Sequence, residues 1–328
     1  MKPPVFVVGC PRSGTTLVNF ILNKNEECFL LNEKGLYSNL YRDFHRYHEN
    51  GKPPGQVFRN CAQQVVQGHR ECTLATGDQI ERSIRNASAD WTSLLSTFME
   101  MLVRRNRPPA RIWGDKTPGA TFYVDAILEN HPKARIVYVK RHPLHVVQSL
   151  SRSSFSYASN DRLTNSFVVR AYVEAFEAKR DVLPGNQLFE VKYEDLLRDP
   201  ERIVSQLCQF AGITYKKGML DSADEETRTL FGWPENKAWE PVRPQQSSQK
   251  TPQDISVASY LRDVMEQYGY ESEEESLSAR WIAKTRLLPF RGLNTAYNIG
   301  RRMKYPEYRS EVLQKWPSRE RLRSWFSG

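Results

Sequence analysis

The sequence has no long hydrophobic run and few cysteines. No stretch approaches the ~20 consecutive apolar residues of a transmembrane helix. Because only Met-Lys-Pro-Pro precedes the first predicted strand, we expect no secretory leader. The five cysteines are odd in number and lack metal-ligand spacing, a usage that favours a reducing compartment. These absences predict a cytoplasmic protein with no disulfide framework and no metal site.

The basic residues are concentrated at the end of the chain. The net charge of the 328 residues is +9, yet twelve of the 47 Lys and Arg and only three of the 38 Asp and Glu lie in residues 279–328. Residues 1–278 therefore hold 35 charges of each sign. A basic tail suits nucleic acid, but no stretch has the pattern of a nucleic-acid-binding module, and no such partner is predicted.

Short apolar stretches alternate with helical patterns along most of the chain. Such alternation predicts an α/β fold with a P-loop-like central parallel sheet flanked by helices, followed by a basic, mostly helical C-terminal extension. Ligands of parallel sheets bind at the carboxyl ends of the strands, so polar residues that follow the strands are expected to meet at one rim. The predicted strands are residues 5–9, 28–32, 111–115, 135–140 and 188–192.

A glycine-containing loop joins the first predicted strand to a helix. Gly9 and Gly14 have the spacing of a nucleotide-binding P-loop, but Thr15 stands where that loop carries its lysine. Arg12 is the replacement cation, and its guanidinium can make forked contacts with a phosphate or sulfate. The pattern predicts an anion cradle at the helix N-terminus, formed by residues 12–16, and argues against a nucleoside-triphosphate hydrolase.

The run Pro-Arg-Ser-Gly-Thr-Thr at residues 11–16 resembles the sulfotransferases that use 3′-phosphoadenosine 5′-phosphosulfate (PAPS), in their bacterial-type and tyrosylprotein-sulfotransferase-like branch. The resemblance implies that PAPS is the donor, that 3′,5′-ADP (PAP) is the product and that no metal is needed. The first loop would bind the 5′-phosphosulfate through Arg12, Ser13, Gly14, Thr15 and Thr16.

Further motifs extend the resemblance. Arg141 and Ser149 have the eight-residue spacing of the family's 3′-phosphate site, and Tyr193 opens a Tyr-Glu-Asp-Leu segment that implies a nucleotide contact. The Arg-Lys-Gly segment of the cytosolic branch is missing, and Ser248 and Lys250 stand in a comparable place as nucleotide contacts. The resemblance implies a sulfotransferase domain over residues 1–270, with a variable surface insertion at about 48–78 and the extension at 271–328.

The resemblance also implies the catalytic residues. Glu33 follows Arg12 by twenty-one residues, as in the tyrosylprotein-type branch, and would be the general base. Lys116 matches the family lysine that contacts the transferred sulfuryl group, and Arg12 would share its charge-stabilising role. A surface or helix-capping role remains open for Glu33, as does a pairing with Lys34. Asp115 either orients Lys116 or is a structural cap.

Three questions stay open at this point. A P-loop small-molecule kinase and a non-catalytic nucleotide-binding module are the alternatives to a sulfotransferase. The acceptor would be a hydroxyl, less favourably an amine, on a lipid, a glycan or a secondary metabolite. The extension at 271–328 either contacts an anionic membrane peripherally or folds back on the domain.

Overall fold

A computed structural model describes residues 1–48, 52–66, 74–153, 161–180, 183–221 and 257–270. These residues form two compact units. The first contains residues 1–141 together with 179–221, and the second contains 142–178 together with 257–270.

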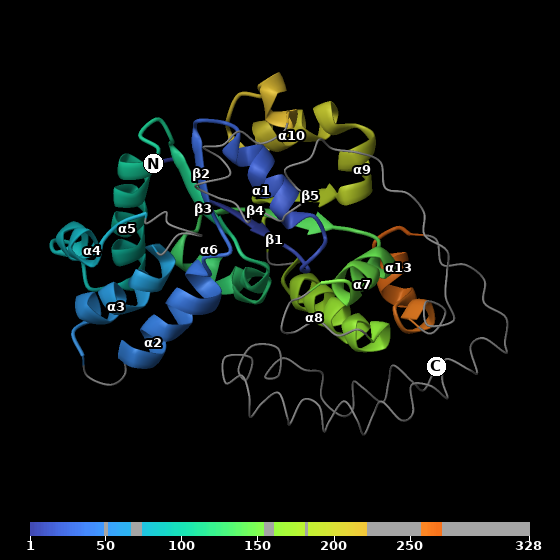
Figure 1. Cartoon of the computed structure of the whole chain (residues 1–328), viewed down its shortest axis with the longest axis horizontal. Coiled ribbons are helices and arrows are strands. Elements are labelled where there is room, and N and C mark those ends of the chain that lie inside the picture. The colour runs from blue at the N-terminus through green and yellow to red at the C-terminus, as the bar shows by residue number, and fades with distance from the viewer. Residues whose placement is uncertain (49–51, 67–73, 154–160, 181–182, 222–256, 271–328) are drawn as a thin grey trace. The chain divides into compact units, whose positions relative to one another are not determined.

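The first unit carries the sheet and most of the helices (Figure 1). In chain order its elements are β1 (Val5–Val8), α1 (Thr15–Asn23), β2 (Cys28–Asn32), the π-helix η1 (Leu36–Tyr41), α2 (Arg42–His48), α3 (Pro54–Val66), α4 (Gly77–Ile84), α5 (Trp91–Asn106), β3 (Ile112–Lys116), the 3₁₀ helix η2 (Pro118–Tyr123), α6 (Val124–Asn130), β4 (Arg135–Lys140), β5 (Leu188–Lys192), α9 (Tyr193–Arg198), α10 (Pro200–Ala211) and the 3₁₀ helix η3 (Lys217–Leu220).

The five strands form one sheet in the order β2-β3-β1-β4-β5, and every neighbouring pair is parallel. The predicted α/β fold with a central parallel sheet flanked by helices is confirmed. Because β1 lies in the middle, the loop that follows it opens beside the ends of β3 and β4. In register, Asn32 at the end of β2 is paired with Lys116 at the end of β3, so their exits are adjacent.

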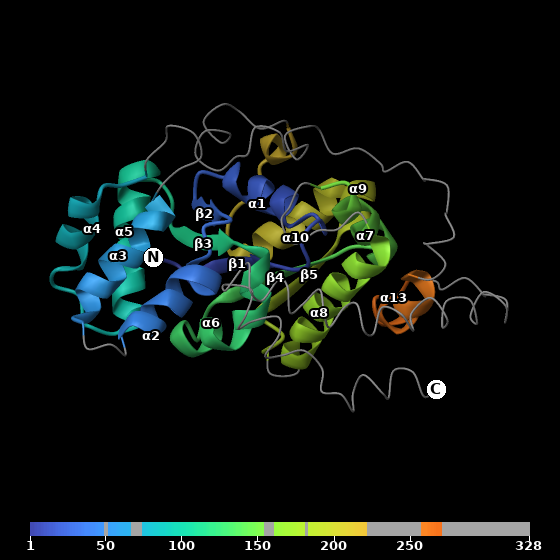
Figure 2. The same cartoon turned by 60° about the horizontal axis from the view of Figure 1, so that its bottom comes forward.

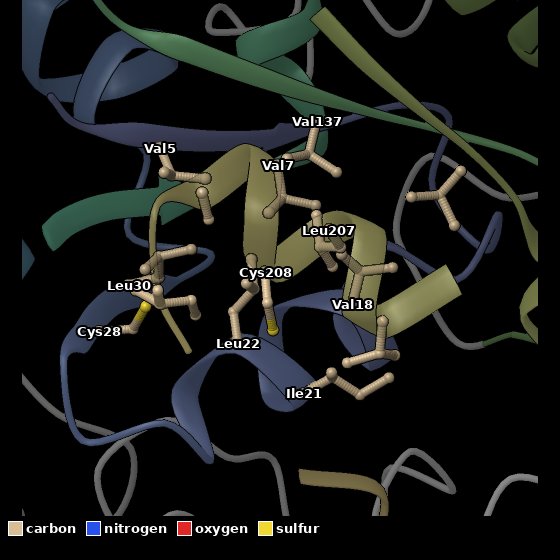
Figure 3. Packing of buried hydrophobic residues seen from close by; sticks show 14 of the residues in the cluster. Val5, Val7, Val18, Ile21, Leu22, Cys28, Leu30, Val137, Leu207 and Cys208 are labelled. Carbon is tan, nitrogen blue, oxygen red and sulfur yellow. The ribbon is translucent and has the colours of Figure 1, made fainter. Parts of the chain in front are cut away.

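One face of the sheet packs against α1, α9 and α10 (Figure 3). Alternate residues of a strand point to the same face, and Val5 and Val7 of β1 accordingly both join this core. Burying each such side chain contributes about 1.5–3 kcal/mol. The core residues labelled in Figure 3 are Val5, Val7, Val18, Ile21, Leu22, Cys28, Leu30, Val137, Leu207 and Cys208.

The opposite face is aromatic. The ring of Phe6 meets Tyr37 of η1 edge-on, with centroids 5.6 Å apart, and meets Trp113 of β3 at 6.0 Å. The side chain of Trp91, the first residue of α5, contacts Tyr37 at 5.8 Å. These rings fix η1 and the start of α5 against the sheet.

Helix α3 lies within the variable insertion predicted at about 48–78, and that assignment stays a prediction. This helix is amphipathic and buries one side, with Phe58 fully enclosed, and it packs between α2 and α4 (Figures 1 and 2). Proline is well suited to the first turn of a helix, and α3 begins at Pro54.

The second unit is helical and contains α7 (Pro143–Ser151), α8 (Arg162–Arg180) as far as Ala178, and α13 (Arg262–Gln267). Its central contact is the buried guanidinium of Arg170. Nη1 and Nη2 donate to the two carboxylate oxygens of Asp263 at 2.8 and 2.6 Å, and Nη2 also donates to the Tyr260 carbonyl. This forked ion pair joins α8 to α13.

None of the helices in the described residues is both long and apolar enough to cross a membrane. The extension at 271–328 lies outside those residues, so its predicted helical content and membrane contact stay predictions. The boundary predicted at residue 270 likewise stays a prediction.

The centre of the sheet depends on a glycine in β3. A Cβ atom at Gly114 would lie 1.8 Å from the carbonyl oxygen of Val5 on the neighbouring strand. We expect Gly114→Ala to lower the free energy of unfolding by about 3 kcal/mol or more, because the strands must move apart. Urea denaturation measures the change. Gly185→Ala is the control, since nothing lies within 4 Å of its added Cβ, and equal stability of the two variants would contradict the close approach.

Candidate active site

The loop after β1 is pinned where it leaves the strand. The Gly9 N–H donates to Oγ1 of Thr121, a fully buried residue of η2, at 3.0 Å. A turn follows, in which the Ser13 N–H donates to the Cys10 carbonyl at 3.1 Å. Burial raises the pKa of the Cys10 thiol, so this cysteine stays protonated and is no nucleophile.

The loop delivers backbone N–H groups to a helix N-terminus. Gly14 is the N-cap of α1 with φ +104°, and no side chain caps the helix. The first N–H groups of an uncapped helix carry a partial positive charge that favours anions. Only glycine fits, because a Cβ would lie 2.4 Å from Cδ2 of Tyr193. The geometry is that of an anion cradle.

Two further features of the loop point to a ligand. Ser13 is 1% exposed, and within the described part of the chain its Oγ has no hydrogen-bond partner. Arg12 has φ +71°, a left-handed conformation that non-glycine residues rarely adopt. Such strain is found mainly at functional sites.

Lys116 brings three predicted site residues together. Its side chain is fully buried, and Nζ donates to Oε1 of Glu33 at 2.6 Å and to Oγ1 of Thr16 at 3.0 Å. The Glu33 side chain is 28% exposed, so the carboxylate reaches from solvent to the buried ammonium. The Glu33 carboxylate is thus paired with Lys116, and its role as the general base stays a prediction.

Burial governs the protonation of the two charged residues at the end of β3. It lowers the pKa of Lys116, against the opposing effects of Glu33 and Asp115, and the charge of Arg12 lowers it further. Burial raises the pKa of Asp115 to about 6, partly offset by hydrogen bonds and by Lys116. Two ionisable groups are thus held in a dry environment, where electrostatic contacts are strong.

Arg141 and Tyr193 contact the same loop. Nη1 of Arg141 donates to the Arg12 carbonyl at 2.9 Å, and its guanidinium carbon lies 4.5 Å from the centre of the Tyr193 ring. The structure therefore places the sequence-predicted residues Arg141 and Tyr193 beside the loop. Ser149 lies on α7 in the second unit, and Ser248 and Lys250 lie outside the described residues.

Sequence reasoning missed Thr121 and Thr117, whose hydroxyls bond the loops after β1 and β2. Oγ1 of Thr117 accepts the Gly35 N–H at 2.9 Å. Thr117 follows the predicted Lys116 directly, but no motif marks either threonine as a loop anchor. Neither could be found from the sequence, because the bonds join residues 82 and 112 positions apart.

Comparison with known proteins agrees with this geometry. The profile of a sulfotransferase family matches residues 3–217, well over half of the chain. The chain belongs to the sulfotransferase family. The sulfotransferase fold is also found in the sulfotransferase domain of the Synechococcus PCC 7002 olefin synthase, with a TM-score of 0.53 and 17% identity over 82% of this chain and 95% of that one.

Two relatives of this sulfotransferase are known from sequence. The omega-hydroxy-beta-dihydromenaquinone-9 sulfotransferase Stf3 of Mycobacterium bovis is 25% identical over 69% of each chain. An uncharacterized protein of Aquifex aeolicus is 24% identical over 67% of this chain, which spans only 27% of that protein's length. The bacterial-type family is confirmed, whereas the tyrosylprotein-like branch stays a prediction.

The residues available to a metal are few. In the parts of the sulfotransferase that the structure describes, no three His, Cys, Asp or Glu side chains gather at one point. The cations of the site are instead the side chains of Arg12, Lys116 and Arg141.

The raised pKa of Asp115 predicts a pH-dependent stability. The native state binds this proton more tightly than the unfolded chain, whose value is 3.8, so the contribution to stability is complete below about pH 4 and is lost as the pH rises through about 6. Asparagine does not titrate, so the Asp115→Asn variant does not lose this stability as the pH rises. We expect its free energy of unfolding, relative to wild type, to rise by about 2–3 kcal/mol between pH 4 and pH 7. Denaturant titrations at several pH values measure it, and a constant difference would contradict it.

Proposed function

We propose that the protein transfers the sulfuryl group of PAPS to an acceptor hydroxyl, with an amine the less favoured acceptor, and that Glu33 is the general base. The observation that carries the proposal is the chain of contacts from Glu33 through Lys116 to Thr16, because it joins a carboxylate at the rim to the anion cradle. Family membership supports sulfuryl transfer as the reaction.

The residues of the loop fit PAPS. The uncapped start of α1 and the buried Oγ of Ser13 offer donors to phosphate or sulfate oxygens, and Gly14 lets the backbone come close. PAPS supplies an activated sulfuryl group, and PAP is the product. Arg12, Ser13, Gly14, Thr15 and Thr16 would hold the phosphosulfate end of the donor.

Each charged side chain has a role in the transfer. Glu33 would take the proton of the acceptor hydroxyl, because its carboxylate is partly exposed where an acceptor can approach. Lys116 and Arg12 would offset the negative charge that grows on the departing phosphate. A lysine suits this task because its ammonium is a compact charge with three donors.

The nucleotide end would be bound by residues of later motifs. Arg141 and Ser149 are proposed for the 3′-phosphate on the strength of their spacing in the sequence, and Tyr193 for the nucleotide because it lies beside Gly14. Ser248 and Lys250 remain proposals from the resemblance alone.

The acceptor is proposed to be a hydroxylated lipid or secondary metabolite, with a glycan as the further candidate. The name of the mycobacterial relative specifies a hydroxylated menaquinone derivative, which supports a hydroxyl on an apolar molecule. Peripheral contact with an anionic membrane through residues 271–328 and a cytoplasmic location remain predictions.

Two measurements on the wild-type protein test the function. Calorimetry should show binding of 3′,5′-ADP without added metal. Incubation with PAPS that carries heavy sulfur and with lipid, glycan or metabolite extracts should yield a labelled product in mass spectrometry. Wild-type protein that fails to bind 3′,5′-ADP would rule out the proposal, and Mg²⁺-dependent turnover of ATP would instead favour the kinase alternative.

The first variant tests the base. Glu33→Gln keeps an oxygen that can accept from Lys116 but cannot take a proton, so we expect kcat to fall by about 10²–10⁴-fold while 3′,5′-ADP binding persists. Glu27→Gln is the matched control. Glu27 is also paired with a lysine, Lys2, at 3.1 Å, and its side chain is 25% exposed, but it precedes β2 at the other end of the strand. Equal rates in the two variants would exclude Glu33 as the base.

The second variant tests the nucleotide contact. We expect Arg141→Ala to weaken binding of 3′,5′-ADP by about tenfold or more, since a hydrogen bond to a charged group contributes about 1.5–3 kcal/mol. Calorimetry measures the change. Arg198→Ala is the control, because this arginine of α9 is 77% exposed and pairs only with Asp195 among the ion pairs of the described residues. Unchanged affinity in Arg141→Ala would remove it from the site.

A further inference from the structure

The loop that carries Glu33 is tied at three points to the end of β3. The Glu33 N–H donates to the Lys116 carbonyl at 2.7 Å. The Gly35 N–H donates to Oγ1 of Thr117 at 2.9 Å, and the Leu36 N–H donates to Oδ2 of Asp115 at 3.3 Å. Three consecutive residues of β3 and its exit thus accept backbone N–H groups from residues 33, 35 and 36, and the Asp115 carboxylate also accepts from the Lys34 N–H.

The loop needs these bonds because its backbone is strained. Glu33 has φ +54° and Gly35 has φ +66°, so two residues of this short loop are left-handed. A left-handed conformation is costly for a residue with a side chain and persists only where the surroundings enforce it. The direction of the Glu33 carboxylate therefore depends on what holds the loop.

Besides accepting from Gly35, the hydroxyl of Thr117 hydrogen-bonds the Asp115 carboxylate, and this bond lowers the pKa of that carboxyl against the effect of burial. Thr117 is the N-cap residue of η2, a position at which a threonine hydroxyl usually bonds its own helix. Here it makes no such cap bond and accepts from Gly35 instead. Asp115 is fully buried, and it likewise directs Oδ2 to the Leu36 N–H at the start of η1.

We propose that Thr117, supported by Asp115, is a positioning residue for Glu33. Its hydroxyl holds the loop in the conformation that aims the carboxylate at Lys116 and at the acceptor hydroxyl. The inference rests on the proposed function, in which Glu33 is the base, and adds the residue that sets where this base stands.

The test is Thr117→Val, which keeps the shape of the side chain and removes the acceptor oxygen. We expect kcat to fall by roughly ten- to a hundredfold, because small displacements of a reacting group cost about that much. The Kd of 3′,5′-ADP should stay within about twofold, because its proposed contacts lie on other elements. Thr117→Ser restores the oxygen and should recover most of kcat.

A double variant separates positioning from general stability. In the Glu33→Gln background the base is already lost, so adding Thr117→Val should change kcat by less than about twofold.

Thr92→Val is the matched control, because Thr92 is also half-buried and its hydroxyl bonds one residue, Asn130. The kcat of Thr92→Val should equal that of wild type. If Thr117→Val does not fold, Thr117→Ala is judged by the same criteria.

Asp115 provides an independent check. Asp115→Asn keeps an oxygen for the Leu36 N–H and should retain most of kcat, whereas Asp115→Ala should lose it. The inference is overturned if Thr117→Val has the wild-type kcat, or if its effect is undiminished in the Glu33→Gln background. Wild-type protein that binds no 3′,5′-ADP would instead reject the proposed function, so the two failures are distinguishable.

Discussion

The site depends on one buried ammonium group. An unpaired lysine charge away from water is very costly, and partners must compensate for it. Lys116 has two, the carboxylate of Glu33 and the hydroxyl of Thr16, at 2.6 and 3.0 Å. Since Thr16 follows β1, Glu33 follows β2 and Lys116 ends β3, this compensation fixes the relative positions of three strand exits. The burial of one charge therefore also assembles the rim.

Strain lies where the proposed chemistry lies. In the described residues, the non-glycine residues with positive φ are Arg12 and Glu33. The sequence motifs predict a catalytic role for both residues. A strained residue costs free energy that packing elsewhere must offset, and the buried faces of the sheet provide that packing. The coincidence is independent support for placing the reaction at these two loops.

The sequence predicted what local pattern determines. Strand bounds such as Leu188–Lys192 follow from apolar runs within a short window. Arg12, Lys116 and Arg141 could be assigned to the ends of strands because each lies next to an apolar run in the sequence. Local patterns did not predict helix α3, whose Pro-Gly start resembles a loop. They also did not predict that the hydroxyls of Thr117 and Thr121 bond the neighbouring loops. Their bonds are set by the register of the sheet, which no window of sequence contains.

The end of β3 serves two neighbouring loops because a strand alternates its side chains. Lys116 points to the loop after β1, where it meets Thr16, while Asp115 and Thr117, one position before and after, bond the loop after β2. Glu33 lies in the loop after β2, but its carboxylate contacts Lys116, whose ammonium also bonds Thr16 beyond the loop after β1. A shift of β3 by one residue would exchange these faces and separate the base from the cradle. The register of one buried strand therefore couples the base to the anion cradle.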